Sequence, residues 1–191
     1  MTSIDMLILF IIYKRLTTHI ICRYQQSIMN GYFGKNNLAG IGPIWIAKTS
    51  KGICRLSFGG SKSSFLKALP QSINWIESDT HLKNDTKLIS SLIDGEKEKI
   101  AIELIEGTTF QRSIWQKIKS IPFGKTKSYT WLAAAVGSPK AYRAAANACG
   151  ANPIPLIIPC HRIIASDGSI GGFSSGITLK RRLLKNEEIY L

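Results

Sequence analysis

Helix start and stop signals recur at short intervals in the second half of the chain, and they constrain the fold more than any other feature. Thr108 and Gln111 form a capping-box pattern, which predicts a helix over residues 110–121. The Pro122–Gly124 stretch ends that helix, because proline removes a backbone donor and glycine favours a turn. A basic helix is predicted over residues 178–188. These signals indicate a C-terminal half made mostly of short helices.

Two further helices are predicted between these. One runs over residues 130–137 and is closed by Gly137. Ser138 is a favoured N-cap and Pro139 fits the first helical position, so we predict that the next helix begins there and stops at Asn152. Two short helices joined by a tight turn containing glycine are typical of a helix-turn-helix.

The first half of the chain predicts strands mixed with helices. Residues 42–58 alternate or run apolar, with a turn at residues 50–52 between two strands. Residues 100–105 predict one more strand, and residues 64–69 and 86–93 predict helices. The fold class that we predict is therefore α+β.

The net charge of the chain is strongly positive. Its 191 residues carry 25 Lys and Arg against 12 Asp and Glu, a formal charge of +13. Both halves contribute, so there is no basic tail. Such a charge favours a polyanion such as nucleic acid, or an anionic membrane. A merely lysine-rich surface with no such partner is the alternative, and charge alone leaves both open.

The cysteines are few and far apart. They are Cys22, Cys54, Cys149 and Cys160, with no C-x-x-C pair. Such usage argues against a disulfide scaffold and favours a reduced, cytoplasmic protein. Cys22 with His19, and Cys54 with His81, match no usual zinc spacing. We therefore expect no metal and no cofactor.

The N-terminal residues do not resemble a targeting segment. Met6–Tyr13 is apolar but too short to span a bilayer, and its positive charges follow it instead of preceding it. We therefore expect no membrane partner. Met29 opens the part that looks organised. We divide the chain into an N-terminal extension of unknown role (residues 1–35), an N-terminal subdomain (36–106) and a C-terminal domain (107–191).

Cys160 and His161 are the residues that most suggest chemistry. A thiolate is the nucleophilic form of cysteine, and a neighbouring base increases its population. Adjacent residues on an extended chain point to opposite sides, so a bridging water is the natural link between the two side chains. Glu187, on the last predicted helix, is a candidate for the far end of such a relay. The dipeptide alone is more often structural than catalytic.

The wider pattern around Cys160 is specific. The segments GTTFQRSIWQKIKSIPFGKTKSY, SPKAYRAAANACGANP, IPCHRII and GGFSSGITLKRRLLKNEE, within residues 107–188, resemble the 6-O-alkylguanine-DNA alkyltransferases. Residues 40–106 resemble the N-terminal half of that family more loosely. The resemblance implies a ribonuclease-H-like subdomain packed on a winged helix-turn-helix domain. It also implies an irreversible, single-turnover transfer of a methyl or other alkyl group from the 6-oxygen of guanine, with the 4-oxygen of thymine as a second candidate substrate.

The resemblance also implies roles for individual residues. Cys160 would accept the alkyl group, and His161 would deprotonate it through water. Glu187 would orient His161 and balance its charge. Asn152 corresponds to a hinge asparagine that holds backbone near the active-site turn. Tyr129 would donate its phenol proton toward the leaving guanine and would lie under a rotated phosphate.

The implied partner is double-stranded DNA with an alkylated guanine, bound through the minor groove by a monomer. Arg143 would enter the base stack in place of the extruded nucleotide. The alanines beside it suit a groove only about 6 Å wide. Backbone contacts to DNA are expected from Thr130, Ser138 and Ser166, and the alkyl pocket is expected to include Phe173 and Ser174. Phe173 stands where many members have tyrosine, and Gly172 and Ser175 also depart from the pattern, which puts the preferred alkyl size in doubt.

Two other functions compete with this interpretation. The first is a DNA-binding regulator that uses the helix-turn-helix alone, with Cys160 as a buried structural residue. The second is a cysteine hydrolase. Its weakness is that Cys160 and His161 are adjacent, whereas such sites generally place nucleophile and base far apart in sequence.

Overall fold

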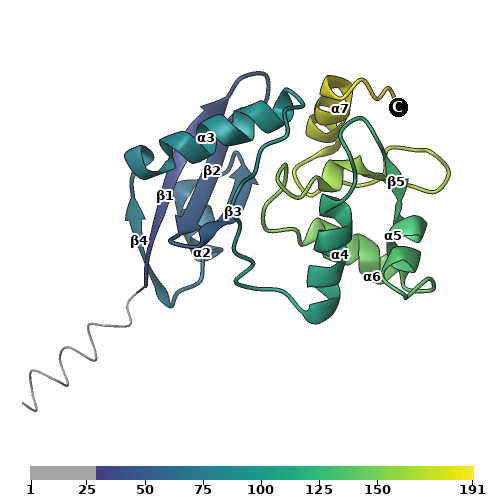
Figure 1. Cartoon of the computed structure of the whole chain (residues 1–191), viewed down its shortest axis with the longest axis horizontal. Coiled ribbons are helices and arrows are strands. Elements are labelled where there is room, and N and C mark those ends of the chain that lie inside the picture. Colours follow the sequence, from purple (N-terminus) through teal and green to yellow (C-terminus); the bar gives the residue numbers. More distant parts are fainter. Residues whose placement is uncertain (1–28) are drawn as a thin grey trace, which may run out of the picture.

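The computed structural model describes residues 29–191 and shows two units side by side, one built on a sheet and one made mostly of helices (Figure 1). The apolar run at Met6–Tyr13 and the pair His19 and Cys22 lie outside the described residues. Within the described part, no helix is long and apolar enough to cross a membrane.

The first unit is a four-stranded sheet with the order β3-β2-β1-β4. Its strands are β1 (Met29–Leu38), β2 (Gly42–Thr49), β3 (Gly52–Phe58) and β4 (Ile73–Glu77). The first three pair antiparallel, and β4 pairs parallel to β1. The two strands predicted within residues 42–58 are confirmed. Residues 29–35, which we had assigned to an N-terminal extension, form most of β1.

Two helices belong to this unit, α2 (Lys62–Lys67) and α3 (Asp79–Ile93), and α3 crosses one face of the sheet (Figure 1). Helix α3 begins seven residues before the predicted start at residue 86. The strand predicted over residues 100–105 is wrong: it is reduced to one bridge between Ile53 and Ile102. The Ile53 N–H donates to Ala101 O, and the Glu103 N–H donates to Ile53 O. Since β3 pairs with this segment through Ile53 alone, no ladder of hydrogen bonds forms.

The second unit contains α4 (Thr109–Lys119), α5 (Tyr129–Ala135), α6 (Tyr142–Gly150) and α7 (Ile177–Asn186). The predicted capping box is confirmed. The backbone N–H of Gln111 donates to Thr108 Oγ1 at 3.2 Å, and the N–H of Thr108 donates to Gln111 Oε1 at 2.9 Å. Each side chain thus satisfies a donor that the first turn of α4 would otherwise leave free.

The predicted start of the third helix at Ser138 and Pro139 is wrong. Helix α6 begins at Tyr142, and Ser138 belongs to the turn before it, where its carbonyl accepts the N–H of Ala141 at 2.8 Å. Ser138 and Pro139 therefore belong to a turn, and the helix does not extend back to them. The preceding helix α5 is capped by Ser128, whose hydroxyl accepts the N–H of Trp131.

One buried cluster joins the two units. It combines residues of the sheet with residues of the segment before Cys160 and of α7: Leu38, Ile44, Ile46, Ile53, Leu56, Ile154, Leu156, Ile157 and Leu183. A backbone hydrogen bond of 2.9 Å from Leu56 N–H to Pro153 O adds a direct link. The sheet therefore supports the chain that leads into Cys160.

Candidate active site

A pocket of about 330 Å³ opens in the helical unit, at the small end of the range of about 300–1,000 Å³ typical of ligand sites. Its lining comes from α5, α6, the Cys160 turn and the loop before α7: Tyr129, Ala146, Asn147, Cys149, Gly150, Cys160, Gly172, Phe173 and Ser174. Cys160 is only 5% exposed. The structure therefore brings the predicted thiol, Tyr129 and both predicted pocket residues around one cavity.

Cys160 begins a single turn of 3-10 helix, η1 (Cys160–Arg162), and does not lie on the extended chain that we expected. The turn forms because the Arg162 N–H donates to Pro159 O at 3.0 Å. Asn152 braces the preceding segment. Its Nδ2 donates to Ile158 O at 2.7 Å, and its Oδ1 accepts the N–H of Ile154 at 3.0 Å.

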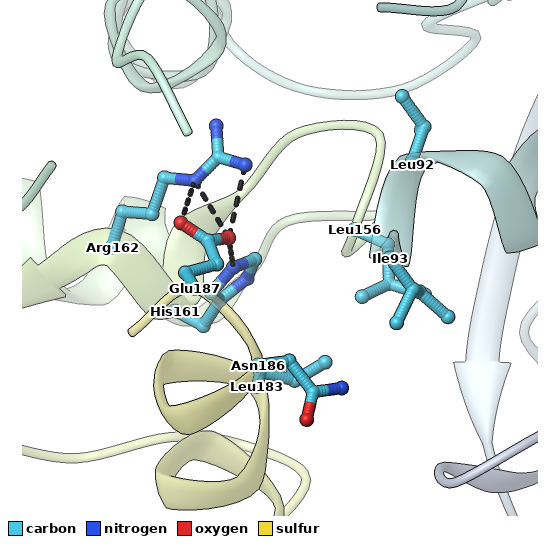
Figure 2. A pocket seen from close by; sticks show the side chains of 8 residues that line it. All are labelled: Leu92, Ile93, Leu156, His161, Arg162, Leu183, Asn186 and Glu187. Carbon is cyan, nitrogen blue, oxygen red and sulfur yellow. Dashed lines mark hydrogen bonds and ion pairs between the residues drawn. The ribbon is translucent and has the colours of Figure 1, made fainter. Parts of the chain in front are cut away.

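His161 and Glu187 form a buried pair, as Figure 2 shows, with 2.7 Å between Nε2 and Oε1. They are 3% and 6% exposed. Arg162 Nε lies 3.0 Å from both carboxylate oxygens of Glu187, and the backbone N–H of Gly124 donates to Oε2 at 2.9 Å. The carboxylate is therefore fixed by three residues from two separate segments.

The partner at Nε2 settles which nitrogen of His161 is free. Because a carboxylate only accepts, the neutral ring donates from Nε2 and leaves Nδ1 as the acceptor. Nδ1 is buried and has no hydrogen-bond partner among the described residues. Burial lowers the pKa of His161, against the opposing effect of Glu187. Burial would raise the pKa of Glu187, but its hydrogen bonds to His161 and Arg162 lower it on balance.

The pKa of Cys160 is also lowered. The largest cause is the neighbouring Cys149 thiol, and burial acts in the opposite direction. Asn152 and the charge of Lys180 lower the pKa of Cys160 further. The site thus combines a thiol whose anion is stabilised with an imidazole that stays neutral and has one free acceptor.

Lys180 is a part of the site that the sequence analysis missed. Its side chain is 0% exposed, and its ammonium donates to Ile163 O at 2.5 Å and to Gly172 O at 3.1 Å. Burial lowers its pKa. A signal was present: Lys180, Leu183, Leu184 and Glu187 follow the spacing of one helix face.

The loop before α7 is tied to α5 and to the sheet unit. The Tyr129 hydroxyl donates to Gly172 O at 3.3 Å, the same carbonyl that Lys180 contacts. Burial raises the pKa of Tyr129 to about 12, so its phenol keeps its proton at neutral pH. The Phe173 ring lies 6.4 Å from that of Phe58 on β3.

Of the predicted DNA-contact residues, Tyr129 lines the pocket and the other four lie outside its lining. Arg143 is exposed on α6, with its guanidinium 5.7 Å from the ring of Tyr142. Thr130 and Ser166 are both exposed, and their hydroxyls hydrogen-bond to each other although they are 36 residues apart. Ser138 lies in the turn between α5 and α6.

The weak zinc pattern of Cys54 and His81 is not realised. Cys54 is buried and its thiol lies 3.4 Å from Ala47 O, whereas His81 stacks on Tyr32. Residues 29–191 contain no group of three or more potential metal ligands.

Comparisons with known proteins identify the family. A family model described as "6-O-methylguanine DNA methyltransferase, DNA binding domain" matches residues 109–189. The chain is 40% identical over 149 residues to a methylated-DNA–protein-cysteine methyltransferase of Methanosarcina barkeri, covering 78% of this chain and 92% of the relative. It is 34% identical over 151 residues to the bifunctional transcriptional activator/DNA repair enzyme Ada of Escherichia coli, covering 77% of this chain and 43% of that protein.

Solved structures share the fold. Mycobacterium tuberculosis OGT, crystallised in complex with DNA, superposes with a TM-score of 0.71 at 30% identity, over 82% of this chain and 92% of that one. The O6-methylguanine-DNA methyltransferase of Pyrococcus kodakaraensis gives a TM-score of 0.60 at 25% identity, over 83% and 99%. The small sheet with its helical companion is thus the mixed α+β architecture that we predicted. The chain belongs to the methylated-DNA–protein-cysteine methyltransferase family.

Proposed function

We propose that this protein repairs DNA by transferring an alkyl group from the 6-oxygen of guanine to Cys160, once per molecule. One observation carries the assignment of the acceptor. Cys160 is a buried thiol in a ligand-sized pocket, next to a neutral His161 whose Nδ1 is free and whose Nε2 is fixed by Glu187. A structural cysteine needs none of these features.

The transfer follows from these positions. The Cys160 thiol gives its proton to His161 Nδ1 through a bridging water, and Glu187 stabilises the imidazolium that forms. The sulfur then attacks the alkyl carbon, so that a carbon–sulfur bond forms as the carbon–oxygen bond breaks. Guanine leaves with the bonding electrons on its oxygen and is neutralised by a proton that Tyr129 donates. The tyrosinate regains its proton from the imidazolium, and the thioether has no ready reversal.

The arrangement around Tyr129 supports its role. Its phenol stays protonated and faces the pocket, with Gly172 O as its present acceptor at 3.3 Å. In this proposal the extruded base replaces that carbonyl as the acceptor. Asn152 braces the turn that aims the thiol, and Phe173 and Ser174 limit the alkyl group. The same pocket would accept an alkyl group on the 4-oxygen of thymine.

We infer that α5 and α6 form a winged helix-turn-helix and that the sheet unit is ribonuclease-H-like. Arg143 and Ala144 are exposed on α6 and Ala146 is half-buried, which suits entry into a minor groove, where one long side chain can replace an extruded base. Thr130, Ser138 and Ser166 would contact the DNA backbone on either side. The base must leave the duplex because the thiol is buried. We also predict that the protein is monomeric and cytoplasmic.

Mass spectrometry of the protein mixed with an oligonucleotide duplex containing 6-O-methylguanine tests the proposal. Wild type should gain one methyl mass per molecule on the peptide with Cys160, with no second turnover in excess substrate. Cys160→Ala should gain none and still bind the duplex, and Cys54→Ala serves as the matched control. A regulator would show no gain in any form, whereas repeated turnover would indicate a hydrolase. A gain on Cys149 or Cys54 would overturn the assignment of the acceptor.

A further inference from the structure

A second thiol lines the same pocket as Cys160. Cys149, near the C-terminal end of α6, is 6% exposed, and its sulfur lies 3.9 Å from the carbonyl oxygen of Cys160. Both thiols are free. The transfer described above gives Cys149 no role.

We propose that Cys149 is a positioning residue for the acceptor, whose S–H donates a hydrogen bond to the Cys160 sulfur and stabilises its thiolate. This inference rests on the proposed function, because it concerns the ionisation of the thiol that accepts the alkyl group.

The Cys149 thiol lies against the carbonyl of Cys160 and lines the same pocket as the Cys160 sulfur. A thiol carries a single S–H donor that rotates about its carbon–sulfur bond. While Cys160 is protonated, that S–H points at the Cys160 carbonyl. When Cys160 ionises, its sulfur becomes the stronger acceptor, and in this proposal the S–H rotates toward it.

Cys149 stays protonated throughout this change. Its pKa is raised well above the usual value, first by its hydrogen bond with Cys160 and then by burial. Its hydrogen bond is also the largest of the effects that lower the pKa of Cys160. The two thiols are therefore not equivalent: one ionises, and the other remains a donor.

Other groups face the Cys160 sulfur from the surrounding elements. Asn152 and Lys180 also lower the pKa of Cys160. The negative charge of Cys160 contributes to the raised pKa of Tyr129 on α5. His161 is the next residue in the chain. Of these, Lys180 also ties down the loop before α7 through Gly172 O, so its removal would disturb the pocket. Cys149 can be changed with less disturbance, because its neighbours on α6 are already small.

The experiment compares wild type with Cys149→Ala and Cys149→Ser as a function of pH, with Cys54→Ala as the control for loss of a buried thiol elsewhere. The first readout is the rate of alkyl transfer from free 6-O-benzylguanine, which needs no DNA. The second is the rate at which iodoacetamide labels the Cys160 peptide. A second pair, Cys149→Val and Cys149→Thr, repeats the test at a larger side-chain volume.

Removal of the donor should raise the apparent pKa of Cys160 by up to about one pH unit, the size of one hydrogen bond to an ionised group. Transfer by Cys149→Ala should then be about two- to tenfold slower at neutral pH and should approach wild type at high pH. Cys149→Ser should recover most of the rate, because its hydroxyl is also a donor. Cys54→Ala should match wild type.

An unchanged apparent pKa in Cys149→Ala, or an equal shift in Ala and Ser, would overturn the inference. So would a slowing that is the same at every pH, which would indicate packing alone. The labelling rate separates this inference from the proposed function. If wild type takes up neither the benzyl group nor a methyl group from duplex DNA, the proposed function fails, while the pH dependence of iodoacetamide labelling still tests the role of Cys149.

Discussion

The two units of the protein bury different kinds of side chain. The sheet unit buries mostly apolar residues, and its buried polar side chains are Thr49 and Asp85. Two of its ion pairs, Lys51 with Glu103 and Lys62 with Glu77, include exposed side chains. The helical unit instead encloses His161, Glu187 and Lys180, each fixed by hydrogen bonds. Buried polar groups are costly unless they are paired, so the three in the helical unit support the site that we propose.

The difference also shows how the units depend on each other. The sheet contributes no side chain to the lining of the thiol pocket. It does pack against Ile154, Leu156 and Ile157, which precede Cys160. One unit therefore carries the reactive groups, and the other fixes the backbone that presents them.

The largest effect is expected for Glu187→Gln, which removes the charge that pairs with Arg162 and His161. Loss of one partner of a buried ion pair should lower the free energy of unfolding by about 3 kcal/mol and also slow alkyl transfer. Denaturant titration and transfer assays would measure both. DNA affinity should change little, because Glu187 lies away from the predicted DNA-binding residues. Glu188→Gln, at the exposed next position, should be nearly neutral; equal losses in both variants would contradict the role of Glu187.

Ile46→Ala, in the sheet unit, should separate stability from chemistry. Ile46 is 0% exposed, so the cavity should lower the free energy of unfolding by about 2–3 kcal/mol. Under conditions in which the variant is still folded, its transfer rate should stay within about twofold of wild type. A large loss of rate in the folded variant would show that the sheet unit tunes the site directly.

Arg143→Ala should slow transfer from duplex DNA tenfold or more, which corresponds to about 1.4 kcal/mol. Nothing then replaces the extruded base in the stack. Transfer from the free alkylated base should remain normal, because it needs no extrusion. Lys140→Ala removes an equal charge from the same surface and should change duplex transfer much less. Equal effects of the two variants would show that Arg143 contributes only its positive charge and would contradict its insertion into the base stack.

The smallest effect concerns pH. Because burial lowers the pKa of His161, the imidazole should stay neutral below its usual value of about 6.5. Transfer should therefore persist at pH 6 and fall only at lower pH. In the same range the unfolded chain binds a proton at His161 before the folded protein does, so stability should fall with decreasing pH by at most about 1.4 kcal/mol per unit. An acidic midpoint for transfer above 6.5 would contradict this.

The parts of the fold that follow local rules could be predicted from the sequence. Helix α4 was predicted because both halves of its capping box lie within four residues. Strand β4 was missed, because five residues become a strand only through parallel pairing with the distant β1. The start of α6 was misplaced because Ser138 and Pro139 suit a turn as well as a helix. Tertiary contacts decide between such alternatives, and a local pattern does not contain them.

The candidate site divides in the same way. Cys160, His161 and Glu187 could be selected from residue type and from the family pattern. The structure pairs His161 with Glu187 and places Cys160 in the pocket lining. Gly124 could not be found, because it contributes only a backbone N–H to Glu187. The sequence gives no reason to distinguish Cys149 from an ordinary core residue. Only the fold of the Cys160 turn places the Cys160 carbonyl beside the Cys149 thiol. Lys180 was not singled out, because it stands among exposed basic residues of α7 and has the same residue type.

The hydrogen bond between His161 and Glu187 joins residues 26 positions apart, and it has a consequence for synthesis. A ribosome adds about 5–20 residues per second, so the chain carries Cys160 for roughly one to five seconds before Glu187 exists. During that interval the thiol has no fixed base and behaves as an ordinary cysteine. An acceptor that can be used only once is thereby left unactivated until the last helix has been made.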